Sequence, residues 1–264
     1  MAMSHPGMPL TAVALTALLA WMVAADTSGE PPADPGRDAQ GPRAFHTDFQ
    51  FARLQHSTDM GRVWGRERWL TDWPEAELHL LLGINRITRI DAAHSGRLVS
   101  IMDEDLFDYP FLYAVEPGQW RFTKREAARL RDYLLRGDFL LVDDFHGSFE
   151  WQGFATGLRQ IFPDRQIVEI PRDDSLFHTV YDLPEPTPIP GIGAALSGVT
   201  WERDGMTPHW RGVYDDEGRL MVVINFNMDL GDGWEHADVP EYALRYTGAA
   251  YRHAINYIVY AMTH

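Results

Sequence analysis

The chain has 264 residues, of which 45% are hydrophobic and 12% aromatic, so it can bury a sizeable core. Its formal net charge of -15 leaves no basic surplus to replace the counterions of nucleic acid, and we expect no nucleic-acid partner. The sequence contains no cysteine, which excludes disulfides, zinc–thiolate sites, iron–sulfur clusters and cysteine nucleophiles.

The amino-terminal part differs in composition from the rest. Residues 10–25 read LTAVALTALLAWMVAA, an uncharged apolar run with small residues before Asp26, which predicts a signal peptide over residues 1–25. The run is short for a transmembrane helix, and an uncleaved anchor is the alternative. Residues 26–44 are rich in Pro, Gly and Asp and predict a flexible spacer. We therefore expect an exported protein, periplasmic or in the cell envelope, with no membrane span in the mature chain and one α/β domain over residues 45–264.

The folded part is predicted to begin with a strand and a helix. Residues 48–55 alternate in polarity, which predicts a strand with Phe49 and Phe51 in the core. After a polar loop, Pro74 opens a helix at its first turn, where a missing N–H costs nothing. The apolar side of this helix is predicted to consist of four residues: Leu78, Leu81, Leu82 and Ile87.

Apolar strands alternate with amphipathic helices in the middle of the chain. Residues 111–115 (FLYAV) and 139–142 (FLLV) are short apolar runs. Between them Thr123 stands three residues before Glu126, a capping box that opens a helix. Two more elements follow: a helix over about residues 150–162 and a fourth strand over residues 167–170 (IVEI). This alternation predicts a parallel sheet covered by helices on both faces.

The pattern changes near the carboxyl terminus. Residues 209–214 and 219–225 flank an acidic, glycine-containing turn, which predicts a β-hairpin. A last helix is predicted to start near Pro240.

Five blocks, in this order, resemble a bacterial family, domain of unknown function 4159: DYPFLYAVEPGQW, RLRDYLLRGDFLLVDDFHG, FPDRQIVEIPRDDSLFHTVYDL, INFNMDLGDGWE and NYIVYAM. The resemblance covers residues 49–264. It implies kinship with the class I glutamine-amidotransferase-like superfamily, and hence a flavodoxin-like three-layer α/β sandwich with a mostly parallel sheet. The amidotransferases of that superfamily carry a cysteine at a sharp strand-to-helix turn. Here that turn reads Asp143-Asp144-Phe145-His146-Gly147, so amidotransferase chemistry by that route is excluded.

The first group of candidate site residues follows the predicted strand at residues 139–142. Ligands bind at the carboxyl ends of strands in open parallel sheets, which selects Asp143, Asp144 and His146 as catalytic candidates. A carboxylate beside an imidazole is able to hold a metal or to act as an acid–base pair. The plainer alternative is an Asp that caps the next helix beside a locally bonded His146.

A second group follows the predicted strand at residues 219–225. If the strand persists, period two places Asn225, Asn227 and Asp229 on one face. The segment partly resembles a calcium loop but departs from the EF-hand pattern by one position, and a turn stabilised by Asn and Asp side chains is the alternative. The ligand-binding candidates here are Asn227, Asp229, Asp232, Trp234 and Glu235. A divalent cation, which the sequence permits without requiring, would be held by Asp144, His146, Asp229 and Asp232.

A third group consists of His178 and Tyr181, after the predicted fourth strand. These side chains are ligand-binding candidates if they line the same mouth. The alternative is a core-edge pair satisfied by backbone.

Three hypotheses for the function remain. The first is a non-catalytic envelope module that binds a small polar ligand or a partner protein at the carboxyl edge of the sheet. The second is a metal-assisted or Asp/His-dependent hydrolase that uses the same edge. The third is a structural protein whose edge is filled by packed side chains. Whether the two acidic loops meet depends on the strand at residues 219–225 being parallel to the strand at residues 139–142.

We predict that the full chain is exported and processed, because residues 10–25 have the length and composition of a signal peptide. Fractionation of cells that express the full chain should recover the shortened protein outside the cytosol. Recovery of the uncleaved chain in the cytosol would overturn the prediction.

Overall fold

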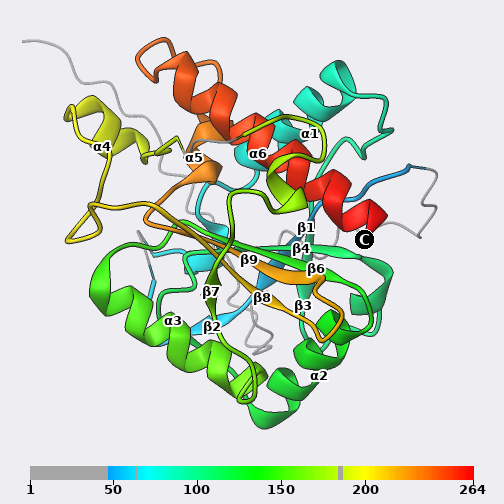
Figure 1. Cartoon of the computed structure of the whole chain (residues 1–264). Coiled ribbons are helices and arrows are strands. Elements are labelled where there is room, and N and C mark those ends of the chain that lie inside the picture. The colour runs from blue at the N-terminus through cyan, green and yellow to red at the C-terminus, as the bar shows by residue number, and fades with distance from the viewer. Residues whose placement is uncertain (1–46, 63–64, 184–186) are drawn as a thin grey trace, which may run out of the picture. The chain divides into compact units, whose positions relative to one another are not determined.

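A seven-stranded sheet lies at the centre of the computed structural model, which describes residues 47–62, 65–183 and 187–264 (Figure 1). The predicted signal peptide and spacer lie outside the described residues. The strand order is β3-β1-β4-β6-β9-β8-β7. Five neighbouring strands are parallel: β3 (Arg97–Ser100), β1 (Ala52–Gln55), β4 (Phe111–Val115), β6 (Phe139–Asp143) and β9 (Leu220–Phe226).

The remaining strands are antiparallel additions. β8 (His209–Tyr214) pairs with β9 as the predicted hairpin, and β7 (Val168–Glu169) pairs with β8 at the edge of the sheet. The predicted fourth strand is therefore no buried parallel strand but a two-residue edge strand whose side chains are exposed. Residues 167–170 are mostly apolar, which suggested a buried strand. In the sheet, however, β7 has a neighbouring strand on one side only, β8. Two short strands, β2 (Ser57–Thr58) and β5 (Trp120–Arg121), form a separate antiparallel pair.

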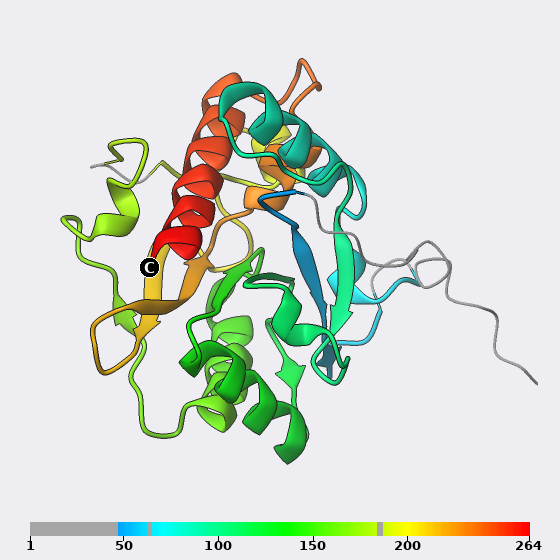
Figure 2. The same ribbon diagram turned by 90° about the vertical axis from the view of Figure 1, so that its right-hand side faces the viewer.

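Helices cover both faces of the sheet (Figures 1 and 2). One face carries α1 (Glu75–Ile87), α5 (Leu230–Glu235) and α6 (Leu244–Thr263), and the other carries α2 (Lys124–Leu135) and α3 (Gly147–Ile161). Alternate strand residues enter two separate cores, so Leu141 and Val223 pack under α6 while Leu140 and Val142 pack under α3. Short elements complete the fold: α4 (Ile192–Leu196) and the 3₁₀ turns η1 (Arg68–Leu70), η2 (Leu106–Asp108) and η3 (Ser175–Phe177).

The helix boundaries depend on local chemistry that the sequence partly reveals. The predicted capping box is present: Glu126 N donates to Thr123 Oγ1 at 3.2 Å, and Thr123 N donates to Glu126 Oε2 at 2.7 Å. α3 begins at Gly147, earlier than predicted, directly after the turn that leaves β6. Near the carboxyl terminus the predicted loop contains α5, and α6 begins at Leu244 rather than near Pro240.

The buried face of α1 differs from the predicted one. Of the four predicted residues Leu81 is buried, but Leu78, Leu82 and Ile87 are 41%, 47% and 56% exposed. The helix buries Glu77, Leu80 and Ile84 instead. The predicted apolar side is rotated around the helix axis relative to the observed one, because a glutamate such as Glu77 is expected on the surface. In the structure Glu77 is buried against the guanidinium of Arg53 on β1, on the side of α1 that also buries Leu80 and Ile84.

Arg53 also fixes the loop that precedes α1. Its side chain is fully buried, and Nη1 donates to the carbonyl oxygens of Trp69, at 3.1 Å, and Thr71. The guanidinium lies 5.1 Å from the centroid of the Tyr113 ring, on the neighbouring strand. One buried cation therefore ties β1, β4, α1 and the loop before α1 together.

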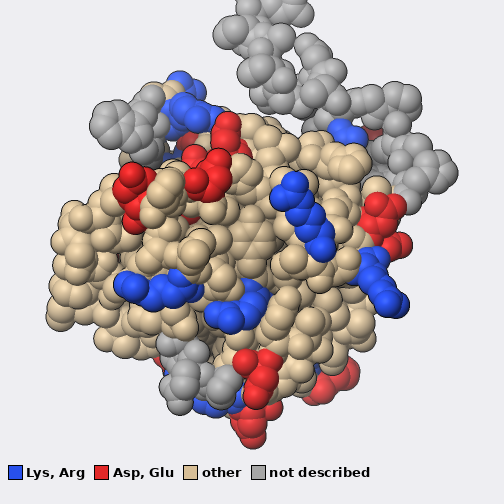
Figure 3. All heavy atoms as spheres, turned by 90° about the horizontal axis from the view of Figure 1, so that it is seen from above, with Lys and Arg blue, Asp and Glu red and all other residues tan. Residues whose placement is uncertain are grey.

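Charged side chains of both signs are interspersed on the face of the molecule seen from above (Figure 3). None of the helices in the described part of the chain combines the length and the apolar character needed to cross a membrane.

We predict that Arg53→Met lowers the free energy of unfolding by about 3–5 kcal/mol, because it leaves the Glu77 carboxylate buried without its cation. Chemical denaturation checks the value. Arg136→Met is the matched control, since Arg136 pairs with Asp132 on the surface and such pairs contribute at most about 1 kcal/mol. Equal losses in the two variants would contradict the role given to Arg53.

Candidate functional site

The two acidic loops meet at the carboxyl edge of the sheet because β9 is the parallel arm of the hairpin. It pairs with β6 in parallel register, Leu140 with Val222 and Val142 with Ile224. Beyond the strands the loops hydrogen-bond directly: Asp144 N donates to Met228 O at 3.2 Å. Asn227 Oδ1 accepts from Gly147 N at 2.9 Å.

Asp143 fastens the second loop to the sheet. Its side chain is fully buried, and Oδ2 accepts hydrogen bonds from Tyr113 Oη at 3.0 Å, Leu230 N at 2.8 Å and Gly231 N at 3.1 Å. A carboxylate that receives the first N–H groups of a helix stabilises that end of the helix. The contacts of Asp143 Oδ2 therefore position α5, which contains three of the predicted site residues, Asp232, Trp234 and Glu235.

Three carboxylates converge beside α5. Oxygens of Asp72, Asp229 and Asp232 all lie within 4.8 Å of one another. Asp229 caps α5 by accepting from Asp232 N at 2.7 Å, and Asp232 Oδ2 accepts from Ile192 N at 2.6 Å. Asp72 Oδ2 is inaccessible to solvent and has no hydrogen-bond partner among the described residues. We call these three residues the acidic cluster.

Two glycines make room for the acidic cluster. A Cβ atom on Gly231 would collide with Asp72 Oδ2 and lie 3.0 Å from Tyr113 Oη. A Cβ atom on Gly191 would lie 2.7 Å from Glu202 Oε1, 3.0 Å from Asp229 Oδ2 and 3.2 Å from Asp232 Oδ2. Glu202 is thus a fourth carboxylate at the border of the cluster.

Strained backbone gathers at the same edge. Among the described residues other than glycine, five have a positive φ, between 52° and 62°. Left-handed backbone costs such residues free energy, and it persists where the surrounding structure imposes it, often at functional sites. Three of the five are acidic and the other two border the loops: Asp72, Glu116, Asp144, Arg203 and Asn227.

Burial raises the pKa of the carboxyl groups at this edge and so makes them weaker acids. It raises the pKa of Asp72, Asp144 and Asp229 well above the ordinary value, and neighbouring carboxylates raise it further: Asp232 for Asp72, Glu116 for Asp144 and Asp144 for Asp229. Burial also raises the pKa of Asp143 to about 7, although its hydrogen bonds oppose the shift. At neutral pH these carboxyl groups therefore hold protons. A bound cation would displace the protons.

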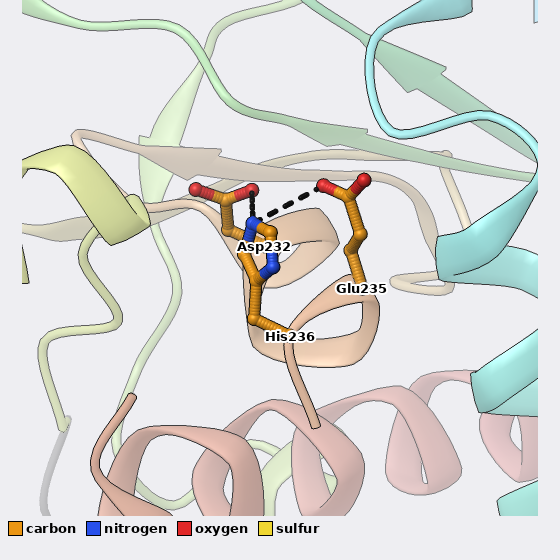
Figure 4. Close-up of side chains that lie close together, drawn as sticks. All are labelled: Asp232, Glu235 and His236. Atoms are coloured by element: carbon orange, nitrogen blue, oxygen red, sulfur yellow. Dashed lines mark ion pairs between the residues drawn. The ribbon is translucent and has the colours of Figure 1, made fainter. Parts of the chain in front are cut away.

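Asp232, Glu235 and His236 form a neighbouring triad (Figure 4). His236 Nε2 lies 3.2 Å from Asp232 Oδ1 and 3.3 Å from Glu235 Oε2. The hydrogen bond to Asp232 raises the pKa of His236, and the same contact, against burial, lowers the pKa of Asp232. The triad thus places a basic group against Asp232, whereas Asp72 and Asp229 have no ion pair with a described residue.

Asp144 and His146 lie together behind the acidic cluster. His146 is 3% exposed, and its Nε2 lies 3.3 Å from Asp144 Oδ1. Burial and the charge of Arg203 lower the pKa of His146 to about 3, so the imidazole is neutral at neutral pH. A neutral imidazole is able to accept a proton or to ligate a metal.

The other predicted residues are not all at this edge. Trp234 is fully buried and packs against Phe51 and Tyr113, with ring centroids 6.2 and 5.5 Å away, so it belongs to the core. His178 bonds to Asp182 at 2.5 Å and to the carbonyl of Arg172, within its own loop.

Tyr181 is anchored to α6 through Asn256, whose Oδ1 accepts from Tyr181 N at 2.8 Å. The expected period-two face also fails, because β9 ends at Phe226 and Asn227 turns with φ 62°. Asn225 is buried with Tyr257, whose hydroxyl donates to its side chain at 3.1 Å.

Sequence reasoning missed four acidic or basic neighbours of the site. His236 stands four residues after Asp232 and is recoverable from helical spacing once α5 is recognised. The remaining three reach the edge from loops distant in sequence, without a local pattern that marks them: Asp72, Glu116 and Glu202.

A mostly parallel α/β domain with an acidic carboxyl edge is thus the class that fold and site define. Residues 50–262 match the family model described as Domain of unknown function (DUF4159), and the chain belongs to that family. No curated protein matches this sequence.

We predict that the metal-free protein loses stability as the pH rises above about 7. Acids whose pKa is raised by folding bind more protons in the folded state than in the unfolded state, so stability falls as pH rises through the raised values. In this range the buried His146 and His253, with pKa lowered to about 3, are neutral in both states.

Denaturation in a chelator measures the loss, which is about 1.4 kcal/mol per pH unit for each proton that only the folded state holds. Asp229→Asn should flatten the pH profile. A profile that stays level in the unsubstituted protein would show that these carboxyls are not protonated.

Proposed function

We propose that this domain binds a divalent cation at the acidic cluster, and through it a small polar ligand at the carboxyl edge of the sheet. The observation that carries the proposal is the convergence of Asp72, Asp229 and Asp232 within 4.8 Å, with Asp72 Oδ2 buried and unpartnered in the described structure. Asp72 lies in the loop before α1, Asp229 caps α5 and Asp232 lies within α5. Asp72 thus comes from a part of the chain far from α5, so the convergence is not a by-product of one helix or strand.

Electrostatics favours a cation over a structural role for the cluster. Carboxylates in a low-dielectric site repel each other, and their convergence is stable only with protons, a basic partner or a bound cation. Within the cluster His236 is a basic partner for Asp232 alone, and the buried guanidinium of Arg53 is already engaged by Glu77 and two carbonyl groups. Asp72 and Asp229 form no ion pair with a described residue. The strained backbone of Asp72 adds a further cost that packing alone does not explain.

The donor set indicates which cation fits. Three carboxylates, with Glu202 close by, supply hard oxygen ligands, which suit Mg²⁺, Ca²⁺ or Mn²⁺. The ligating residues would be Asp72, Asp229 and Asp232. His146 and Asp144, which the sequence also selected, would lie in the second layer, where they orient groups around the cation.

The strand order supports the superfamily assignment and the place of the ligand. The five parallel strands, numbered in chain order, run 2-1-3-4-5 across the sheet, which is the flavodoxin-like order. In such sheets ligands bind outside the carboxyl ends near the point where the order reverses, here between β1 and β4. Glu116 follows β4 directly, and its charge is felt by Asp144.

The experiment is a titration of the metal-stripped protein with Mg²⁺, Ca²⁺ and Mn²⁺, followed by calorimetry and thermal denaturation. We expect at least one cation to stabilise the protein, by about 2.7 kcal/mol at one hundred times its Kd. Asp72→Asn and Asp229→Asn should each weaken binding by about tenfold or more. Both variants should raise the melting temperature of the metal-free protein at neutral pH, because each removes a carboxyl group whose raised pKa costs folding free energy.

Asp173→Asn is the matched control, since Asp173 is exposed and distant from the cluster in sequence. It should leave cation binding unchanged. The proposal fails if none of the three cations binds, or if the cluster variants bind as well as the control does.

A second candidate is the hydrolase hypothesis, which the Asp144–His146 pair favours. The neutral imidazole, 3.3 Å from a carboxyl group, is suited to take a proton from water. His146 is nearly buried, at 3% exposed. The metal-assisted form of this hypothesis needs the same cation, whereas an Asp/His-dependent hydrolase would not.

We also propose that the protein is exported. An exported cation-dependent binding module agrees with the apolar run at residues 10–25 and the spacer that follows it.

A further inference from the structure

Asp232 belongs to two groups of ligand atoms at the carboxyl edge. In the acidic cluster, one of its oxygens lies within 4.8 Å of oxygens of Asp72 and Asp229. In the triad on α5, ligand atoms of Asp232, Glu235 and His236 likewise lie within 4.8 Å of one another. The cation proposed above uses only the first group, so the carboxylate of Glu235 and the imidazole of His236 are not used by it.

The two oxygens of Asp232 face different neighbours. Oδ1 lies 3.2 Å from His236 Nε2, within the triad (Figure 4). Oδ2 accepts from Ile192 N at 2.6 Å. A Cβ atom on Gly191 would lie 3.2 Å from this Oδ2 and 3.0 Å from Asp229 Oδ2, so both oxygens border the same glycine. A carboxylate whose oxygens face two groups of ligands is able to bridge two cations.

The charge of Asp232 reaches the other carboxyl groups of the edge. After burial, which is the larger cause in each case, this charge raises the pKa of five acids: Asp72, Asp144, Glu202, Asp229 and Glu235. Asp232 is therefore the electrostatic centre of the edge. Cations on both sides of it would offset more of this repulsion than a cation on one side.

A buried oxygen without a partner lies beside the triad as well as in the cluster. Asp72 Oδ2 has no hydrogen-bond partner among the described residues. The carboxyl groups of Asp72 and Glu235 lie within hydrogen-bonding reach of each other, which lowers the pKa of Glu235 against the larger effect of burial. Two carboxyl groups this close need a proton or a cation between them. This contact does not depend on the ion pair between Asp232 and His236.

The donor set of the triad differs from that of the acidic cluster. It combines one imidazole nitrogen with two carboxylates, a set that suits Mn²⁺, Fe²⁺ or Zn²⁺. The side chains of Asp232, Glu235 and His236 are 13%, 26% and 21% exposed, so an ion from solvent reaches them. Metal binding requires the neutral imidazole, and a cation would displace the proton that His236 shares with Asp232.

We propose that the edge binds two divalent cations, one in the acidic cluster and a second held by Asp232, Glu235 and His236, with Asp232 as the bridging carboxylate. The inference rests on the proposed function, because the first cation is the one proposed there. Cations in two-metal sites lie about 3.5–4 Å apart.

The test counts the Mn²⁺ ions that the metal-stripped full chain binds, by equilibrium dialysis and elemental analysis. We expect two ions per chain, and an electron paramagnetic resonance spectrum of a coupled Mn²⁺ pair rather than of isolated ions. His236→Gln should lose the second ion, and Asp229→Asn should lose the first. Each variant should retain one uncoupled ion. Asp232→Asn should weaken both ions by about tenfold or more.

His178→Gln is the matched control, because His178 also faces an aspartate four residues away, Asp182, at 2.5 Å. It should still bind two ions. Thermal denaturation of the metal-free variants checks that each is folded.

Three outcomes would overturn the inference. If the unsubstituted protein and the His236 variant both bind one ion, only the second cation is disproved and the proposed function stands. If one ion binds and both Asp229→Asn and His236→Gln remove it, a single cation is shared by all the ligands. If the unsubstituted protein binds no ion, the proposed function fails together with the inference.

Discussion

The hydrogen bonds of one buried carboxylate, Asp143, hold the carboxyl edge of this domain in place. Its Oδ2 joins the hydroxyl of Tyr113 on β4 to the first N–H groups of α5, while its own backbone ends β6. Two neighbouring strands and a helix from a distant part of the chain thus share one acceptor. The direction of α5, and with it the place of Asp229 and Asp232, follows from this contact.

A second buried charge completes the arrangement from the other side. Arg53 holds the carbonyl groups of Trp69 and Thr71, and so presents Asp72, in a left-handed conformation, to the residues that α5 carries. The fold therefore spends two buried ionic groups on bringing further carboxylates together. Protons stabilise that gathering in the metal-free state, and a divalent cation would stabilise it more.

Much of the fold is predictable from local patterns because those patterns act locally. The capping box at Thr123 and the apolar runs that become β4 and β6 decide their own elements, and the hairpin turn fixes β8 against β9. The phase of α1 was mispredicted because Glu77, buried by an ion pair, disguises the apolar stripe. α5 was missed because it is short and its start depends on Asp143, which no local pattern reveals.

Some residues of the candidate site are likewise predictable from the sequence, and others are not. Asp144, His146, Asp229 and Asp232 follow strands whose carboxyl ends are recognisable, so topology alone selects them. Asp72 and Glu202 reach the site from loops distant in sequence, next to Gly231 and Gly191, where a Cβ atom would meet their carboxylates. A single sequence contains no sign of these approaches. Trp234 shows the opposite error: an aromatic residue among acidic ones looks like a binding residue, yet it fills the core between Phe51 and Tyr113.

The most direct measurement is an anomalous-difference map from crystals of the protein grown with Mn²⁺. The proposed site predicts a peak at about 2.0–2.2 Å from oxygens of Asp72, Asp229 and Asp232, a distance typical of small hard cations. It would be contradicted by a map without a peak there, in which these carboxyl groups hydrogen-bond to one another through shared protons.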